Sequence, residues 1–457
     1  MANPAENNVK NESPAQENKM GVMPVGKLLF TMSLPIMISM LVQALYNVVD
    51  SMFVARVSEN ALTALSMAFP IQNLMIAVST GLGVGLNAVL SRALGAKDEK
   101  GVNRAATNGI MLLFICGLVF MLGGATIVRP YFEMQTDIAE IVESGVDYTT
   151  IVMLGSMGIF MQILFERLLQ STGRTLLTMV SQGAGAIANI ILDPIFIFGL
   201  FGVPKMGVAG AAYATILGQW IAAAIGLVMN IRKNPEVSIS MKGFRPHGAT
   251  IRRILAIGIP SVVMQSIGSI MTFLMNQILI AFSATAVAVF GVYFKLQSFV
   301  FMPVFGLNNG TVPIVAYNFG ARRGDRMRQT IKYSICAAVA IMIVGMLMFQ
   351  SIPDKLLRLF DASEEMLRLG VPAISFPLAG FGIGAGSVFQ ALGYSVYSMI
   401  ISLIRQLVVL IPCAYAIGRM TGDVTGVWWA FVIAELVSLT ASALYLRRVN
   451  RDVIRTL

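Results

Sequence analysis

The chain has 457 residues, of which 56% are hydrophobic and only 12% are charged, and its formal net charge is +10. Soluble domains contain about 25% charged residues, so the composition excludes an ordinary soluble protein. Apolar runs of the length that a bilayer requires, about 20 residues, recur from end to end. In chain order, the predicted spans are 28–54, 62–90, 106–127, 141–168, 175–200, 208–230, 251–281, 285–316, 330–351, 366–391, 395–417 and 425–446.

The positive charge follows the predicted topology and does not indicate a nucleic-acid partner. Most of the 33 Lys and Arg residues fall in the two chain ends and in the loops after spans two, four, six and eight. Positive charge marks the cytoplasmic side of a membrane. The sequence therefore predicts that both termini are cytoplasmic, which agrees with an even number of spans.

The N-terminal end and the isolated reactive residues suggest no chemistry of their own. The first twenty residues are polar and lack an apolar core, which predicts a disordered tail and no signal peptide. The three cysteines all lie in apolar runs, where we expect them to be small packing residues. His247 lies in the basic loop after span six and is expected to be solvated.

The two halves of the chain form an internal repeat. Segments that begin at Leu34 and Ile259 align at an offset of 225, so that Pro35 matches Pro260. Each repeat holds six spans, which gives both halves the same orientation. This is the parallel-repeat plan of secondary transporters, which handle substrate near the midplane between the halves.

The fold predicted from these features is an all-α membrane protein with twelve transmembrane helices in two pseudo-symmetric six-helix bundles. Its expected parts are a cytoplasmic tail at 1–26, an N-lobe at 27–231, a cytoplasmic linker at 232–250, a C-lobe at 251–447 and a cytoplasmic tail at 448–457.

Two aspartates interrupt apolar spans of the N-lobe. Asp50 lies in span one and Asp193 in span five, where a carboxylate costs roughly 2.5–3.5 kcal/mol. Asn189 shares a helix face with Asp193, and Pro194 leaves a backbone carbonyl without a partner. These oxygens could bind a sodium ion, or Asn189 could hold a protonated Asp193. The alternative is a helix–helix hydrogen bond without a transport role.

Polar residues in neighbouring spans have less specific interpretations. Tyr148 and Thr215 could add oxygen atoms to the acidic cluster, although packing or backbone contacts are the usual role of such residues. Glu166 stands beside Arg167 at the end of span four, where a solvated position is expected.

Charged residues also occur inside spans of the C-lobe. Glu435 and Arg405 both fall near mid-depth in the last two spans, which favours a structural ion pair because an unpaired buried charge is costly. Lys295 could touch a substrate, gate a cavity or reach toward the membrane boundary.

Enzyme chemistry is not indicated. The sequence has no HExxH, nucleophile-elbow or Walker A pattern and no second histidine. We therefore expect neither an enzyme nor a cofactor, and an ion gradient, of H⁺ or Na⁺, remains as the energy source. The 30 methionines fit a broad apolar cavity that accepts many shapes.

Nearly the whole chain beyond the N-tail resembles the MATE (multidrug and toxic compound extrusion) transporters, in particular their MepA-like branch. The resemblance rests on residues 47–54 in span one, 189–194 in span five and 293–310 in span eight, and on Arg405-Gln406 with Pro412 in span eleven. It implies a V-shaped exporter that ejects amphipathic, often cationic compounds by using a proton or sodium gradient.

The resemblance also implies roles for individual residues. Where relatives have an N-lobe cation site, an Asp of span one acts with an Asn and an Asp of span five and a Thr of span six. Asp50, Asn189 and Asp193 match by motif, Thr215 matches by context, and Tyr148 is suggested by its position in span four. Some relatives have carboxylates in spans seven and ten, where this sequence has none, so coupling through those acids is not expected.

The sequence thus predicts a multidrug exporter of a bacterial plasma membrane, with the ion switch in the N-lobe. Proton coupling is favoured over sodium bound by Asp50, Asn189 and Asp193. Expected partners are drugs or toxic organic cations and the lipid bilayer, and the protein is expected to be a monomer. Candidate cavity residues are Gln43, Asn47, Met67, Gln72, Tyr293, Lys295, Gln297 and Arg405. The alternatives are a flippase or exporter of a lipid-linked or other endogenous metabolite, and a membrane receptor or scaffold.

Overall fold

The computed structural model describes residues 17–124, 126–239, 244–353, 355 and 373–456, and every regular element within these ranges is helical. The first half comprises α1 (Lys19–Val22), α2 (Val25–Ala55), α3 (Glu59–Gly95), α4 (Glu99–Gly124), α5 (Val128–Glu133), α6 (Ala139–Leu154), α7 (Met157–Ser171), α8 (Thr175–Phe198) and α9 (Val208–Lys233). The second half comprises α10 (Gly248–Ile280), α11 (Ala284–Gly320), α12 (Gly324–Ser351), α15 (Phe376–Leu392), α16 (Ser395–Leu403), α17 (Leu410–Thr421), α18 (Val424–Val427) and α19 (Trp429–Asp452). The predicted all-α fold is confirmed.

Eleven stretches of described helix are long and apolar enough to cross a membrane, and a bent pair of helices supplies a twelfth if it counts as one span. The pair is α6 and α7, which meet at 45° within the predicted span 141–168. A side chain at Gly155 would meet Ile216 of α9 at 2.3 Å, and Ser156 donates a hydrogen bond to the carbonyl of Gly117 on α4 (3.0 Å). Close packing against α9 and α4 therefore accompanies the bend.

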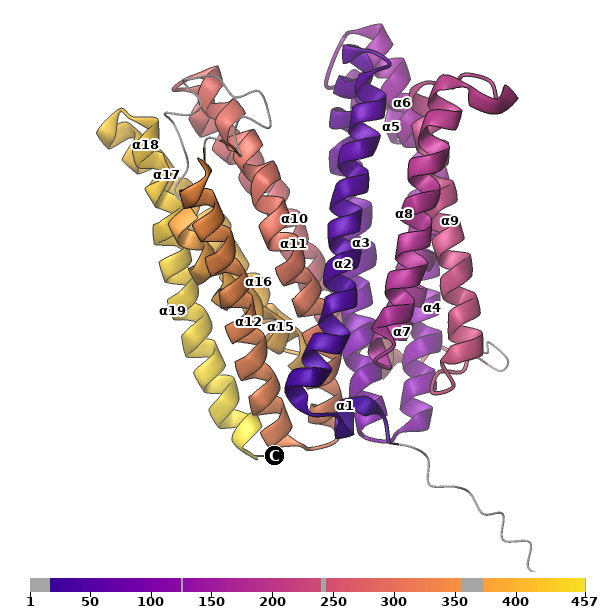
Figure 1. Cartoon of the computed structure of the whole chain (residues 1–457), viewed down its shortest axis with the longest axis vertical. Coiled ribbons are helices and arrows are strands. Elements are labelled where there is room, and N and C mark those ends of the chain that lie inside the picture. The colour runs from indigo at the N-terminus through magenta and orange to yellow at the C-terminus, as the bar shows by residue number, and fades with distance from the viewer. Residues whose placement is uncertain (1–16, 125, 240–243, 354, 356–372, 457) are drawn as a thin grey trace, which may run out of the picture.

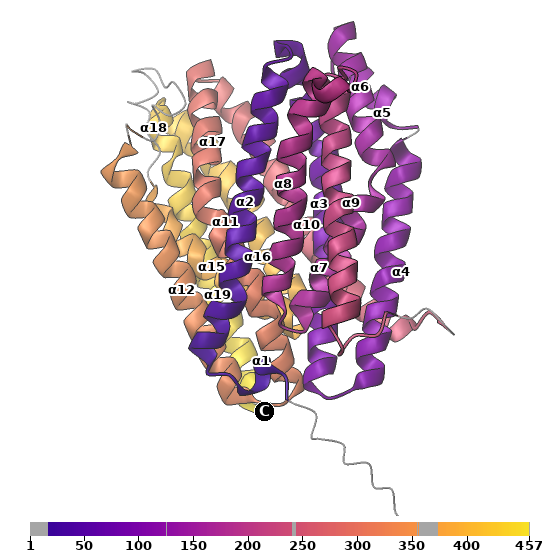
Figure 2. The same cartoon turned by 45° about the vertical axis from the view of Figure 1, so that its right-hand side comes forward.

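The helices form two bundles that diverge from one end of the molecule. Figure 1 shows α2–α9 on one side and α10–α19 on the other. The bundles meet at the end where α1 and the C-terminus lie, which we call the joined end, and separate toward the opposite, splayed end. In Figure 2, turned by 45°, the two bundles overlap, and α1 and the end marked C again lie at the joined end.

The first helix of each bundle, α2 or α10, packs against helices of the other bundle. Leu28, Leu29 and Met32 of α2 are buried in a cluster with residues of α11 and α12, whereas Ile254 of α10 is buried among residues of α3, α4 and α7. We call the contact of α2 and α3 with α10 and α11 the seam. Each bundle is therefore packed against the first part of the other bundle's leading helix.

The seam reflects the internal repeat because equivalent glycines make equivalent close contacts. A side chain at Gly95 of α3 would lie 1.9 Å from the carbonyl oxygen of Tyr317, and one at Gly320 of α11 would lie 2.0 Å from that of Arg92. The N-caps of the same helices, Ser58 and Ser283, are also 225 residues apart, and each accepts a backbone N–H at 3.0 Å. The repeat thus extends to backbone contacts.

Candidate functional site

Helix α8 contributes the most enclosed acid of the first bundle. Asp193 has no exposed surface, and Asn189 lies one turn before it on the same face. With the Asn189 amide oriented to suit its neighbours, its nitrogen donates to Asp193 Oδ2 (3.3 Å) and its oxygen accepts from the backbone N–H of Thr215 on α9 (3.2 Å). The predicted association of Asn189, Asp193 and Thr215 is therefore present in the structure.

Helix α2 brings the second acid to the same region. Asp50 is 9% exposed, α2 packs along α8, and Asp50 lies within electrostatic reach of Asp193. One carboxylate oxygen of each residue, Oδ1, is buried without a hydrogen-bond partner in the described part of the chain. The sequence could not place Asp50 on the face toward α8, since the packing of two distant helices decides it.

The acids lack compensation by positive charge. Among the described residues, no ion pair involves Asp50 or Asp193, and both carboxyl groups are buried away from solvent. A buried carboxylate without a cationic partner is strongly unfavourable. The pair is therefore suited to bind a proton or a metal cation, and an organic cation could neutralise it as well.

Polar side chains surround the acids. Tyr148 of α6 is buried within electrostatic reach of both, and its hydroxyl accepts from Gln72 of α3 (2.7 Å). Gln43 of α2 accepts from Gln182 of α8 (3.2 Å). Tyr148 thus lies near the two aspartates, but its hydrogen bond is to Gln72. The hydrogen bonds of Gln43 and Gln72 connect helices that flank the aspartates.

Glu166 is buried, contrary to the sequence prediction. The expectation of a solvated position is wrong, because Glu166 and Arg167 are each only 6% exposed. Glu166 accepts from Gln162 (2.9 Å), and Thr178 of α8 donates to its backbone carbonyl (3.4 Å). Glu166 and Tyr46 of α2 interact electrostatically, as do Tyr46 and the two aspartates. A third buried acid therefore lies toward the same region.

In the second bundle, a buried acid is paired with an arginine. Arg405 and Glu435 form the expected ion pair, with 2.8 Å between Nη1 and Oε1. Arg405 lies in a π-helical turn, Ile404–Val409, which connects α16 to α17. Position 275, the repeat equivalent of Asp50, is a methionine buried with the indole of Trp428 in an apolar cluster. The acids of the first bundle thus have no counterpart at this position.

The Arg405–Glu435 pair supports a stability prediction. Arg405→Met should destabilise the protein by about 3 kcal/mol or more, because Glu435 would be left as an unpaired buried charge. The double variant Arg405→Met/Glu435→Met should recover most of this loss. Thermal unfolding of the purified variants in detergent measures both effects, and equal losses in the single and double variants would contradict the assignment.

The other cavity candidates are dispersed. Tyr293 packs edge-on against Phe349 and lies beside Phe376, within the second bundle. Lys295 is exposed on α11. Gln297 and Met67 are half-buried, and the backbone carbonyl of Met67 accepts from Tyr131 (2.9 Å). The side chain of Asn47 lies outside what the structure describes.

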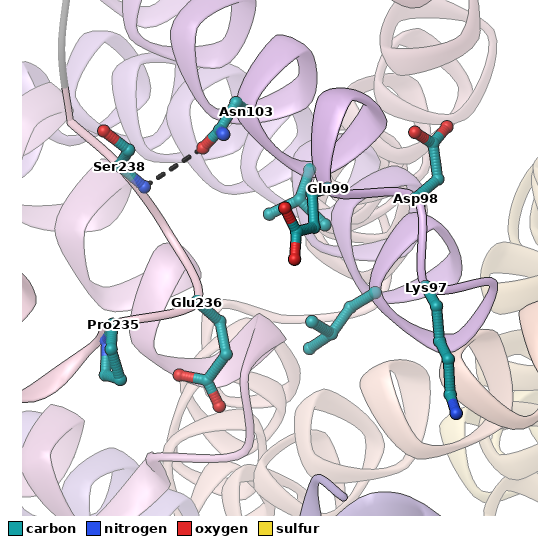
Figure 3. Close-up of a pocket in the computed structure, with 9 residues that line it drawn as sticks. Lys97, Asp98, Glu99, Asn103, Pro235, Glu236 and Ser238 are labelled. Carbon is teal, nitrogen blue, oxygen red and sulfur yellow. Dashed lines mark hydrogen bonds between the residues drawn. The ribbon is translucent and has the colours of Figure 1, made fainter. Parts of the chain in front are cut away.

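A pocket of about 250 Å³ lies at the joined end, apart from the acids. It is lined by Leu94, Lys97, Asp98, Glu99, Val102, Asn103, Pro235, Glu236 and Ser238. Figure 3 shows the backbone N–H of Ser238 donating to Asn103 (3.1 Å) across it. The pocket thus lies between the α3–α4 turn and the segment after α9, and it contains none of the predicted site residues.

Comparisons with known proteins agree with this architecture. A family model described as MatE matches residues 35–195 and 260–416, two segments that begin 225 residues apart, as the repeat does. The multidrug export protein MepA of Staphylococcus haemolyticus (strain JCSC1435) is 29% identical over 421 residues, which are 90% of this chain and 91% of that protein.

Solved structures are similar over nearly the whole chain. An outward-facing multidrug resistance transporter of the MATE family and MOP superfamily superposes with a TM-score of 0.90 at 26% identity, covering 98% of this chain and 100% of the other. A MOP superfamily transporter from Pyrococcus furiosus also gives a TM-score of 0.90 at 26% identity, with coverages of 96% and 98%. For that protein, reversed polarity of the binding pocket was taken to suggest a different function.

Proposed function

The chain belongs to the MatE family, and we propose that it is a secondary active multidrug exporter that exchanges amphipathic organic cations for protons by alternating access. The observation that supports this most directly is the buried pair Asp50 and Asp193, which has no basic partner among the described residues. The similar staphylococcal protein is named a multidrug export protein, which supports drugs as the class of substrate.

We assign the joined end to the cytoplasm of a bacterial plasma membrane. Arg322, Arg323 and Arg326 follow α11 at this end, and Lys97 follows α3 at the equivalent position of the first repeat. Cytoplasmic loops are enriched in such residues. In this orientation the bundles are closed toward the cytoplasm and diverge toward the outside, as an outward-facing state requires.

The proposed coupling runs along α2. The first part of this helix lies in the seam, through Leu28, Leu29 and Met32, and its later part holds Asp50 near α8. Pro35 lies between these parts and removes a backbone hydrogen bond, which makes α2 easier to bend there. Neutralising Asp50 and Asp193 would change the packing of α2 against α8, and α2 would transmit that change to the seam.

A proton fits the local hydrogen bonding better than sodium. In the preferred orientation of Asn189, its amide oxygen accepts the N–H of Thr215 and its nitrogen faces Asp193. That oxygen is then turned toward a donor, while hard cations are bound by several oxygen ligands. Sodium coordinated by Asp50, Asn189 and Asp193 remains the alternative, and it requires Asn189 to rotate.

Drug and proton would compete for the same negative charge. An organic cation close to Asp50 and Asp193 compensates their charge as a proton does, so each favours release of the other. Such competition couples the two fluxes, provided that each ligand binds one conformation better than the other.

The proposal is tested by drug efflux from proteoliposomes under separately imposed gradients. We expect an inward proton gradient to drive efflux of a fluorescent lipophilic cation at zero sodium, and an inward sodium gradient at constant pH to drive little or none. Efflux driven by the sodium gradient alone would show that sodium, and not the proton, is the coupling ion. Efflux that ignores both gradients would contradict secondary active transport.

A further inference from the structure

A short segment before α2 crosses the joined end. This segment, residues 17–23, which we call the strap, contains α1 and lies at the joined end in Figures 1 and 2. Asn18 caps α1 by accepting from the N–H of Met20 (3.0 Å), and the Met20 side chain is fully buried in a cluster with α11 residues. The strap is therefore an ordered part of the seam.

One side of the strap is bound to the first bundle. The side-chain nitrogen of Asn18 donates to the backbone carbonyl of Thr172, at the end of α7 (3.0 Å), and to Oε1 of Glu236, in the segment after α9 (3.2 Å). Glu236 also accepts from Nη1 of Arg174 (3.0 Å). Asn18 thus joins a small polar network that belongs entirely to the first bundle.

The other side is bound to the second bundle. Arg323 pairs with the carboxylate of Glu17 and also donates to the backbone carbonyl of Gly21. Arg326 donates to the carbonyl of Met23 (2.6 Å), and Asn318 donates to that of Met20 (3.2 Å). Several of these bonds involve charged donors, which are the stronger kind.

A short non-helical link joins the strap to α2. Met23 and Pro24, between α1 and α2, have extended backbone conformations, with ψ angles of 141° and 132°. Rotation there would release the strap and leave α2 intact. On the side of the first bundle, Lys19 of the strap lies near Arg174, which has the same charge. Burial, together with this neighbour, lowers the pKa of Lys19. The strap is thus joined to α2 by a non-helical link, and to the two bundles by separate sets of hydrogen bonds.

We propose that the strap is a latch that holds the joined end closed and must detach from one bundle each time that end opens. If the bundles part at the seam, the strap cannot keep its bonds to Thr172 and Glu236 on one side and to Asn318, Arg323 and Arg326 on the other. The inference rests on the alternating access proposed above.

The first experiment measures opening of the seam without transport. The reporter is Ala88→Cys, a buried α3 position packed among residues of α10 and α11, in a protein whose three native cysteines are replaced by alanine. A membrane-impermeant maleimide is applied at the joined end. We expect Asn18→Ala with Arg323→Gln to speed labelling about tenfold or more, the effect of losing one charge-assisted hydrogen bond.

The matched control is Arg328→Gln. Arg328 lies on α12 near Arg323 but is paired with the exposed Asp325 (3.2 Å), away from the strap. It should leave the labelling rate unchanged. Equal rates in the strap variant and the control would overturn the latch. If the reporter stays unlabelled in every variant, and with drug present, alternating access itself fails, which separates the two proposals.

The second experiment tethers the strap to each bundle with a short, reducible bifunctional thiol reagent. Asn18→Cys/Glu236→Cys fixes it to the first bundle, and Glu17→Cys/Arg323→Cys fixes it to the second. We expect one of the two tethers, the one to the bundle from which the strap must detach, to stop drug efflux. Reduction of that tether should restore efflux. The tether that leaves efflux intact identifies the bundle with which the strap travels. Unchanged efflux with both tethers formed would overturn the proposal.

Discussion

Replacing Asp193 by asparagine is expected to reduce gradient-driven efflux at least about 100-fold while the protein remains folded. Asparagine keeps the size of the side chain and can still bond with Asn189, but it cannot gain or lose a proton at neutral pH. Asp50 would then be the only titratable carboxyl of the buried pair, so a proton bound at position 193 could no longer exchange with the drug and the proton gradient would favour drug release far less. Efflux from proteoliposomes under a proton gradient measures the loss.

The control for this variant is Asp147→Asn. Asp147 lies on α6, next to Tyr148, and its side chain is exposed. It has the same chemistry as Asp193 but lacks the burial, so the substitution should leave efflux within about twofold of the native protein. Thermal unfolding should show that Asp193→Asn is at least as stable as the native protein, because a buried unpaired acid is unfavourable to folding. If Asp193→Asn exported drug at the native rate, Asp193 would not be part of the ion switch.

Replacing Gly95 by leucine is expected to force the seam apart. The added side chain would begin 1.9 Å from the carbonyl oxygen of Tyr317, a backbone atom that cannot turn away as a side chain can. Overpacking typically costs about 1–3 kcal/mol, and the upper end of that range shifts the balance between closed and open seams by about 100-fold. Labelling of the buried reporter at position 88 should accelerate, and efflux should fall because the closed state is rarely reached.

Gly183→Ala is the matched control. Gly183 lies inside α8, and a side chain there would meet nothing within 4 Å. Alanine should be neutral, or should stabilise the helix by about 0.5–1 kcal/mol, without changing reporter labelling. Native labelling in Gly95→Leu would mean that the close approach of α3 to α11 does not hold the seam.

The sequence predicted those features that depend on regular spacing. Charge-poor runs indicated the spans, and the offset of 225 identified equivalent positions such as Pro35 and Pro260. The four-residue spacing of Asn189 and Asp193 places both on one face of any straight helix. These predictions needed only local geometry.

Other features depend on tertiary contacts that spacing does not encode. Glu166 and Arg167 resembled a solvated helix end, yet α8 and α9 cover it: Thr178 and Asn230 both donate to backbone carbonyls of α7. The position of Asp50 relative to α8 and the pairing of Tyr148 with Gln72 required the packed bundle. The strap falls within the segment 1–26 that the sequence assigned to a tail, and its Met20 is buried in a cluster to which both bundles contribute.

The most direct measurement is the number of protons released when a drug binds. Purified protein in weakly buffered, sodium-free detergent solution is mixed with a lipophilic cation, and a pH indicator reports the protons released per drug bound. We expect the native protein to release protons and Asp50→Asn/Asp193→Asn to bind drug without releasing any. Equal release from the native protein and the double variant would contradict the claim that these two aspartates form the ion switch.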